Sequence, residues 1–477
     1  MQFHARIWRF FTVVLGALMM LWPALCNGYP LFYPDSMTYL NDGRPLAKIL
    51  FLHAPRGFTG MRSEFYSLGI FFFHWNFSAW PIIAMQALVT SYIIWLVVRS
   101  LAARLVKLQF LALVAVVSLT TSLGWYVSFV MPDILGAVLY LAIYLLVFAR
   151  ETLSTREIGA VAAISCWAMA SHTTHWMLAA ILCALLGLLL LLRWPPMREC
   201  KRGLAWLAAM VLLVAGSQMA LHKYLYGAAT LNGNRMPYLT ARIIADGPGR
   251  WYLQQHCGEL HWAICARVNT LPDTDDAFLW DDDGIWQTSS GDAQARMLRE
   301  EMPLVVSTLR AYPREQSERS LANFREEIDN FALRDFCPNT WMEGEIDRLL
   351  PGVHAKYLRT RQAHLALPND FFTRIQRWVV SASALGILCA VPVLWWRRRW
   401  RILGLAAIIV PVVLANAFIT AVLSEVDSRY QSRVIWLIPL LAGMIALDRF
   451  NCRNLPEAGG VLSRFRGNRS ASALSGF

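Results

Sequence analysis

The stretch MPDILGAVLYLAIYLLVFAR (131–150) has an aspartate near its start, an arginine at its end and an unbroken apolar run between them. Residues 132–149 are long enough to cross a bilayer as a helix, which takes about 17–25 residues. A carboxylate at a membrane boundary costs free energy unless it is solvated or in use, so Asp133 is a candidate functional residue. The stretch therefore predicts a membrane-spanning helix with a functional group at one end.

Similar apolar runs recur along the 477-residue chain, which is 56% hydrophobic and only 16% charged. A soluble protein would carry nearer a quarter charged residues. We expect an all-α polytopic membrane protein. The N-terminal run begins like a signal peptide but lacks a small-residue cleavage site, so we expect an uncleaved first helix. About ten spans are expected, near 8–27, 69–98, 108–125, 132–149, 157–175, 177–193, 203–221, 375–396, 402–423 and 432–448.

The positions of the basic residues predict the orientation of these spans. Lysines and arginines follow the second, fourth, sixth and eighth spans, whereas the short loops near 124–133 and 171–176 have none. Because cytoplasmic loops carry the excess of basic residues, both termini are expected in the cytoplasm. The net charge of +12 therefore reflects membrane topology, and we expect no nucleic-acid partner.

The chain divides by composition into membrane modules and one long polar segment. Residues 222–374 have an ordinary soluble composition, and the apolar spacing within 292–312 is helical, which predicts a mainly helical extracytoplasmic domain. The Gly-, Ser- and Arg-rich end of the chain predicts a disordered tail. The expected parts are an N-terminal module of seven spans (1–221, first outer loop 28–68), the extracytoplasmic domain (222–374), C-terminal transmembrane helices (375–448) and a cytoplasmic tail (449–477).

Two aspartates lie at membrane boundaries on the predicted outer side. Asp35 is in YPDS (33–36), just past the first span, and Asp133 is in MPDI (131–134). Such carboxylates can act as a general base, orient an acceptor hydroxyl, or share a divalent cation such as Mg²⁺ or Mn²⁺. The alternative is structural: each could be a water-facing aspartate at a helix end or a helix N-cap.

Basic residues and histidines lie on the same predicted side. Arg429 and Arg433 belong to SEVDSRYQSR (424–433), and guanidinium groups bind phosphate oxygens bidentately. The alternative for Arg429 is a snorkelling side chain paired with a neighbouring acid, Glu425 or Asp427.

His172 and His175 of SHTTHW (171–176) are three residues apart and would share one helical face. They could bind phosphate, shuttle protons or ligate a metal. The alternative is a pair of ordinary interfacial histidines.

The polar segment contains an acidic run and several cysteines. Residues 271–286 hold six aspartates, which could bind calcium but lack the spacing of the helix–loop–helix calcium site; a solvated loop is the alternative. Cys257 and Cys265 are close in sequence, and a disulfide between them is allowed outside the cytoplasm, with Cys337 as a competing partner.

No Walker A motif, Rossmann glycine pattern or nucleophile elbow occurs in the sequence. Nucleotide-driven transport and cytoplasmic nucleotide-sugar chemistry therefore lose support. Instead, the layout resembles the GT-C superfamily of integral-membrane glycosyltransferases, in particular the branch of protein O-mannosyltransferases and aminoarabinose–lipid A transferases. The likeness is carried by seven spans before a bulky outer domain, Asp35 at the start of the first outer loop, Asp133 in the next, and Arg429 in a late outer loop.

The resemblance implies transfer of a sugar from a polyprenyl-phosphate donor to a glycan, lipid or protein acceptor at the outer face of the membrane. It implies Asp35 and Asp133 as catalytic residues, and Arg429 as a ligand of the donor phosphate. The expected location is the bacterial inner membrane. Many relatives have two adjacent acids in the first loop, whereas Asp35 has no acidic neighbour before Asp42, which leaves a metal-independent mechanism open. A non-catalytic scaffold and a flippase for lipid-linked glycans are the alternatives.

Overall fold

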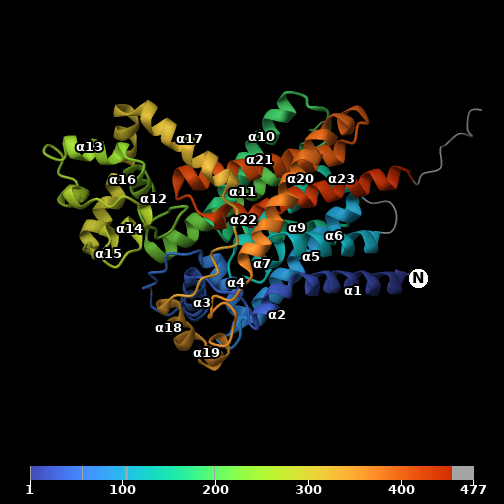
Figure 1. The fold of residues 1–477 in the computed structure, drawn as a ribbon, viewed down its shortest axis with the longest axis horizontal. Coiled ribbons are helices and arrows are strands. Elements are labelled where there is room, and N and C mark those ends of the chain that lie inside the picture. The colour runs from blue at the N-terminus through green and yellow to red at the C-terminus, as the bar shows by residue number, and fades with distance from the viewer. Residues whose placement is uncertain (1, 56, 102–105, 198, 454–477) are drawn as a thin grey trace, which may run out of the picture.

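The computed structural model describes residues 2–55, 57–101, 106–197 and 199–453, and its regular elements there are helices (Figure 1). The first half contains α1 (Gln2–Met20), α2 (Trp22–Asn27), α3 (Pro34–Leu52), α4 (Glu64–His74), α5 (Trp80–Leu101), α6 (Val106–Thr120), α7 (Leu123–Val127), α8 (Asp133–Phe148), η1 (Arg150–Thr152), α9 (Thr155–Ala170), α10 (Thr173–Leu191), η2 (Pro195–Met197) and α11 (Lys201–Tyr226). The second half contains α12 (Tyr238–Ala245), α13 (Pro248–His256), η3 (Ala263–Thr270), α14 (Asp275–Leu279), α15 (Ile285–Thr288), α16 (Gly291–Ala311), α17 (Pro313–Asp329), α18 (Thr340–Leu349), α19 (Pro351–Tyr357), α20 (Asn369–Trp396), α21 (Trp400–Leu423), α22 (Ser428–Ile435) and α23 (Leu437–Arg453).

Six helical segments within the described ranges are long and apolar enough to cross a membrane: α5, α10, α11, α20, α21 and Ser428–Asp448, which joins α22 to α23. The prediction of an all-helical chain is confirmed for the described residues, and these six segments are consistent with an integral membrane protein, while the count of about ten spans stays a prediction. Some predicted runs are interrupted. The run 69–98 divides between α4 and α5, where Trp75 and Asn76 adopt positive φ values of 46° and 56°.

Helix α8 is the centre of the bundle. Every residue from Asp133 to Phe148 is buried, and α8 packs against α5, α9, α11, α21 and α22. A helix that is apolar on all sides has no face suited to water, so it is surrounded by other helices. The start of α1 and the end of α23 lie at one end of the bundle, and α12–α16 lie beyond the other end (Figure 1).

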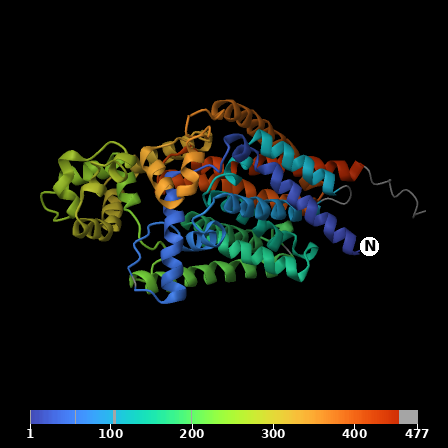
Figure 2. The ribbon, with the colours of Figure 1, turned by 90° about the horizontal axis from the view of Figure 1, so that it is seen from below.

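The predicted outer domain contains more than one packing unit. Residues from Met236 to Leu304 form a separate hydrophobic core within α12–α16. By contrast, α18 and α19 contribute Met342, Ile346 and Tyr357 to the core of the bundle, and α18 packs against α3. Helix α3 runs across the end of the bundle instead of along it (Figure 2). The core of the bundle thus continues into the predicted outer region at α18 and α19, and α3 packs against α18.

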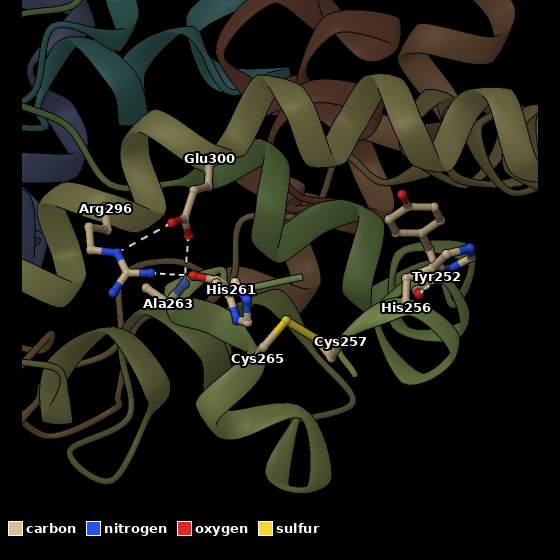
Figure 3. Close-up of a disulfide and its surroundings, with 8 residues drawn as sticks. All are labelled: Tyr252, His256, Cys257, His261, Ala263, Cys265, Arg296 and Glu300. Carbon is tan, nitrogen blue, oxygen red and sulfur yellow. Dashed lines mark hydrogen bonds and ion pairs between the residues drawn. A yellow bond between two sulfur atoms is a disulfide. The ribbon is translucent and has the colours of Figure 1, made fainter. Parts of the chain in front are cut away.

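A disulfide joins Cys257, at the end of α13, to Cys265 in η3 (Figure 3). Their Cα atoms are 5.3 Å apart, and Cys337 is a free, exposed cysteine. Nearby, the Glu300 carboxylate accepts a hydrogen bond of 2.8 Å from the Ala263 backbone N–H, which ties η3 to α16. The bridge thus closes a short loop on the small core of α12–α16.

Candidate functional site

A single β-bridge brings the two predicted outer aspartates together. Leu31 pairs in parallel with Phe129, so the segment before α3 lies beside the segment before α8. The Leu31 N–H donates to the Ser128 carbonyl at 2.9 Å, and the Val130 N–H donates to the Leu31 carbonyl at 3.0 Å. Two loops almost a hundred residues apart therefore share one register.

The two aspartates lie at the same distance in sequence from this bridge, because Asp35 follows Leu31 by four residues and Asp133 follows Phe129 by four. A proline precedes each aspartate at the start of its helix, where its missing N–H is tolerated. Both carboxylates lie in the first turn of a helix, and the helix dipole there favours a negative charge. The N-cap alternative is wrong for both, since the N-cap residues are Tyr33 and Pro132.

Helix α22 places two arginines against these aspartates. Its N-cap Asp427 accepts a hydrogen bond of 2.8 Å from the Arg429 N–H, and Arg433 follows Arg429 by one helical turn. Arg429 Nη1 is 3.7 Å from Asp35 Oδ2, and Arg433 Nη1 is 3.5 Å from Asp133 Oδ1. The four residues predicted to act together thus form two neighbouring ion pairs. The alternative pairing of Arg429 with Glu425 or Asp427 is not the one the structure has.

The two guanidinium groups are buried without a full set of partners. Arg429 is 6% exposed and Arg433 is fully buried. Asn416 Oδ1 accepts a hydrogen bond of 2.9 Å from Arg433 Nη2. Among the described residues, however, Arg429 Nε and Nη1 and Arg433 Nη1 find no hydrogen-bond acceptor. A buried donor without an acceptor is costly, so the arrangement is suited to an anion that brings its own oxygens.

Two tyrosines fix the position of Arg429. Its guanidinium lies 4.3 Å from the ring centroid of Tyr33 and 4.9 Å from that of Tyr430. Arg433 lies 5.1 Å from the same Tyr430 ring. Cation–π contacts of this kind stabilise a desolvated guanidinium without using its N–H groups. The donors of Arg429 therefore stay available.

The two histidines lie beside this cluster, with ring centroids 5.1 Å apart. His172 caps α10, and its Nδ1 accepts from the Thr174 N–H at 3.2 Å. Burial, and then the positive charges of nearby groups including Arg433 and Arg429, lower the pKa of His172 well below its usual value. His175 packs against Gly136 of α8, where a Cβ would lie 2.7 Å from His175 Nε2. His172 is thus a neutral neighbour of the arginines.

Arg62 also belongs to the candidate site, although nothing in the sequence distinguishes it from other loop arginines. It lies in the loop between α3 and α4 and forms an ion pair with Asp35 Oδ1. Its Nη1 also donates to the Tyr238 hydroxyl at 3.2 Å, and its guanidinium lies 5.3 Å from the Trp280 ring centroid. In the sequence, Arg62 is one of several basic residues in the first outer loop, and no spacing distinguishes it.

Three carboxyl groups contact the start of α22, where they accept hydrogen bonds from Asp427, Ser428 and Tyr430. Burial and the neighbouring charge of Asp427 raise the pKa of Glu327 to about 9 and that of Asp335 to about 7. Burial also raises the pKa of Glu425 to about 8. In their protonated forms these groups carry no charge and do not compete with an anion for Arg429.

The residues present do not fit a divalent cation between Asp35 and Asp133. Each carboxylate faces an arginine, whose positive charge opposes a second cation. Within the part of the chain that the structure describes, no group of three or more His, Cys, Asp or Glu side chains could hold a metal ion. In the acidic run, Asp273 and Asp275 pair with Arg250 and Arg242 at 2.9 and 3.2 Å, which places them in ion pairs instead of a calcium loop.

The chain matches no protein-family model, no curated protein and no solved structure. The likeness to GT-C glycosyltransferases therefore stays a resemblance, and the case for a function rests on the buried arginines and carboxylates described above.

Proposed function

We propose that the protein is a GT-C-like glycosyltransferase that moves a sugar from a polyprenyl-phosphate donor to an acceptor at the outer face of the membrane. The observation that carries this proposal is the pair of buried arginines, Arg429 and Arg433, with unpartnered N–H groups beside Asp35 and Asp133. A phosphodiester supplies oxygens that accept hydrogen bonds from these N–H groups. A sugar donor that is linked to a lipid requires no nucleotide-binding site.

In the proposed reaction the donor phosphate binds at α22. Arg429 Nε and Nη1 each lack a hydrogen-bond acceptor, and each can donate to a phosphate oxygen. Arg433 Nη1 adds a third donor one turn further along the helix. These groups stabilise the charge that develops on the phosphate as the sugar leaves it, an effect that is stronger in a site with little water.

Asp35 is the proposed general base. It takes the proton from the acceptor hydroxyl or amine, whose oxygen or nitrogen forms the new bond to the anomeric carbon. The bond between that carbon and the phosphate oxygen breaks, and its electron pair stays on the phosphate. Asp133, held by Arg433, orients the acceptor. The arginines supply the positive charge in this scheme, so we propose a mechanism that needs no Mg²⁺ or Mn²⁺.

Substitutions at Arg429 test the phosphate site. Arg429→Ala is expected to raise the KM for the lipid-linked donor by about 10- to 100-fold, because it removes charged hydrogen bonds. Arg429→Lys keeps the charge but loses the planar guanidinium group with its several N–H donors. Its KM should therefore lie between those of wild type and Arg429→Ala. Transfer of label from donor lipid is the measurement. Arg314, which is exposed and paired only with Glu318 among its described ion-pair partners, is the matched control as Arg314→Ala. Equal KM values for both Arg429 variants and wild type would contradict the assignment.

The proposed location is the bacterial inner membrane, with both termini in the cytoplasm and α12–α16 outside. Two exposed positions test this orientation, Asp282 before α15 and Arg193 after α10. In a chain without the native exposed cysteines, an impermeant thiol reagent should label Asp282→Cys in intact cells and Arg193→Cys only after lysis. The reverse pattern would overturn the orientation predicted by the basic loops.

A further inference from the structure

Arg62 is held by side chains from three separate parts of the chain. It pairs with Asp35 at the start of α3, donates to the Tyr238 hydroxyl of α12, and stacks over Trp280, which follows α14. Arg62 itself lies in the loop between α3 and α4, outside any helix. Its guanidinium can therefore change partners without breaking a helix.

Asp35 is engaged by two arginines at once. Arg62 contacts Oδ1, and Arg429 Nη1 lies 3.7 Å from Oδ2. A general base must come within hydrogen-bond distance of the proton that it removes. Both oxygens of Asp35 face guanidinium groups, so the shift of one arginine would leave a carboxylate oxygen free to accept the proton.

The exposed fractions indicate which arginine can move. The Arg62 side chain is 18% exposed and Asp35 is 17% exposed, whereas the Arg429 side chain is 7% exposed. Arg429 is also fixed between Tyr33 and Tyr430, and its backbone belongs to α22. Apart from Asp35, the partners of Arg62 are the ring of Trp280 and the hydroxyl of Tyr238. These contacts allow its guanidinium group to shift across the ring.

The proposed reaction moves one negative charge away from Asp35, the present partner of Arg62. A donor phosphodiester has one negative charge, and the departing polyprenyl monophosphate has two once the bond to the sugar has broken. Over the same step, Asp35 gains the acceptor proton and loses its own charge. The negative charge therefore moves from Asp35 to the phosphate. After the step, a guanidinium group is stabilised more beside the phosphate than beside Asp35.

We propose that Arg62 transfers from Asp35 to the departing phosphate during the reaction, and so acts as a third phosphate-binding arginine beside Arg429 and Arg433. This inference rests on the proposed function. It assigns Arg62 two roles: it pairs with Asp35 before the acceptor arrives, and it stabilises the dianionic product. Arg62 should therefore distinguish a phosphate monoester from a diester, whereas Arg429 should bind both.

Two short-chain probes test this distinction in detergent-solubilised full-length protein. Farnesyl monophosphate is mostly a dianion at about pH 8, because its second pKa is about 6, and its methyl ester is a monoanion. Arg62→Gln should weaken binding of the monoester by about tenfold or more but change binding of the methyl ester by less than about threefold. Asp35→Asn, which imitates the protonated base, should tighten monoester binding. That gain should vanish in the double variant with Arg62→Gln.

Arg314→Gln is the matched control, since Arg314 is an exposed arginine in an i,i+4 ion pair remote in sequence from the site. If Arg62→Gln fails to fold, Arg62→Lys gives the same comparison, with a smaller loss for the monoester. Equal losses for both probes, or no loss for either, would overturn the transfer of Arg62 while the proposed function stands. If neither probe binds in a way that depends on Arg429, the proposed function itself fails.

Discussion

Asp35→Asn is expected to lower sugar transfer at least about 100-fold while the protein stays folded and inserted. Asparagine keeps the size of the side chain and some of its hydrogen bonding but cannot accept the acceptor proton. The structure adds a second reason, because the neutral amide also loses its ion pairs with Arg62 and Arg429. The rate of label transfer from lipid-linked donor in reconstituted membranes is the measurement.

The matched control for this substitution is Asp370→Asn. Asp370 is also an acidic residue in the first turn of a helix, α20, but it is exposed. It should retain nearly full activity. A fully active Asp35→Asn variant would exclude Asp35 as the base, whereas a wild-type protein without transfer activity would favour the alternative of a non-catalytic scaffold.

Arg433→Ala is expected to destabilise the protein by about 3–5 kcal/mol, because it leaves the Asp133 carboxylate buried without its partner. Both side chains are almost completely buried, at 1% and 3% exposure. Asn416 would also lose the guanidinium that donates to its side-chain oxygen. Thermal unfolding in detergent should show a clear fall in the midpoint temperature.

A double substitution separates stability from activity in this pair. Arg433→Met combined with Asp133→Leu removes both charges and should recover most of the lost stability, since apolar residues of similar volume often replace a buried ion pair without cost. The double variant should nevertheless stay inactive if Arg433 and Asp133 bind substrate. Loss of stability equal to that of Arg433→Ala would show that the pair is required for packing.

The sequence indicated candidate site residues from their charge and position, but it did not show how the helices around them divide. Asp35, Asp133, Arg429 and Arg433 could be chosen because charged groups at the boundaries of apolar runs are costly and few. Their convergence could be expected from their shared predicted side of the membrane, but its geometry could not, because it depends on the Leu31–Phe129 bridge, and a single bridge leaves no periodic pattern in either loop. Arg62 could not be predicted for a related reason, since only its contacts in the folded chain distinguish it from other arginines in loops.

The limits of the span prediction also have a physical cause. Hydropathy does not report short changes of backbone direction, so the run 69–98 looked continuous although Trp75 and Asn76 turn the chain between α4 and α5. Composition likewise grouped 222–374 as one polar segment. It could not show that α18 and α19 pack on the bundle while α12–α16 have their own core.

The Leu31–Phe129 bridge imposes a constraint on chain length. Adding one residue between Leu31 and Asp35, or between Phe129 and Asp133, would shift the aspartate relative to the bridge by up to about 3.5 Å, the length of one extended residue. The carboxylate would then no longer lie against its arginine. Insertions in the more distant parts of the outer loops have no such effect on the bridge. These two four-residue segments should therefore keep a fixed length while the outer region varies in size, so that the unit of α12–α16 can diverge without rebuilding the carboxylate pair.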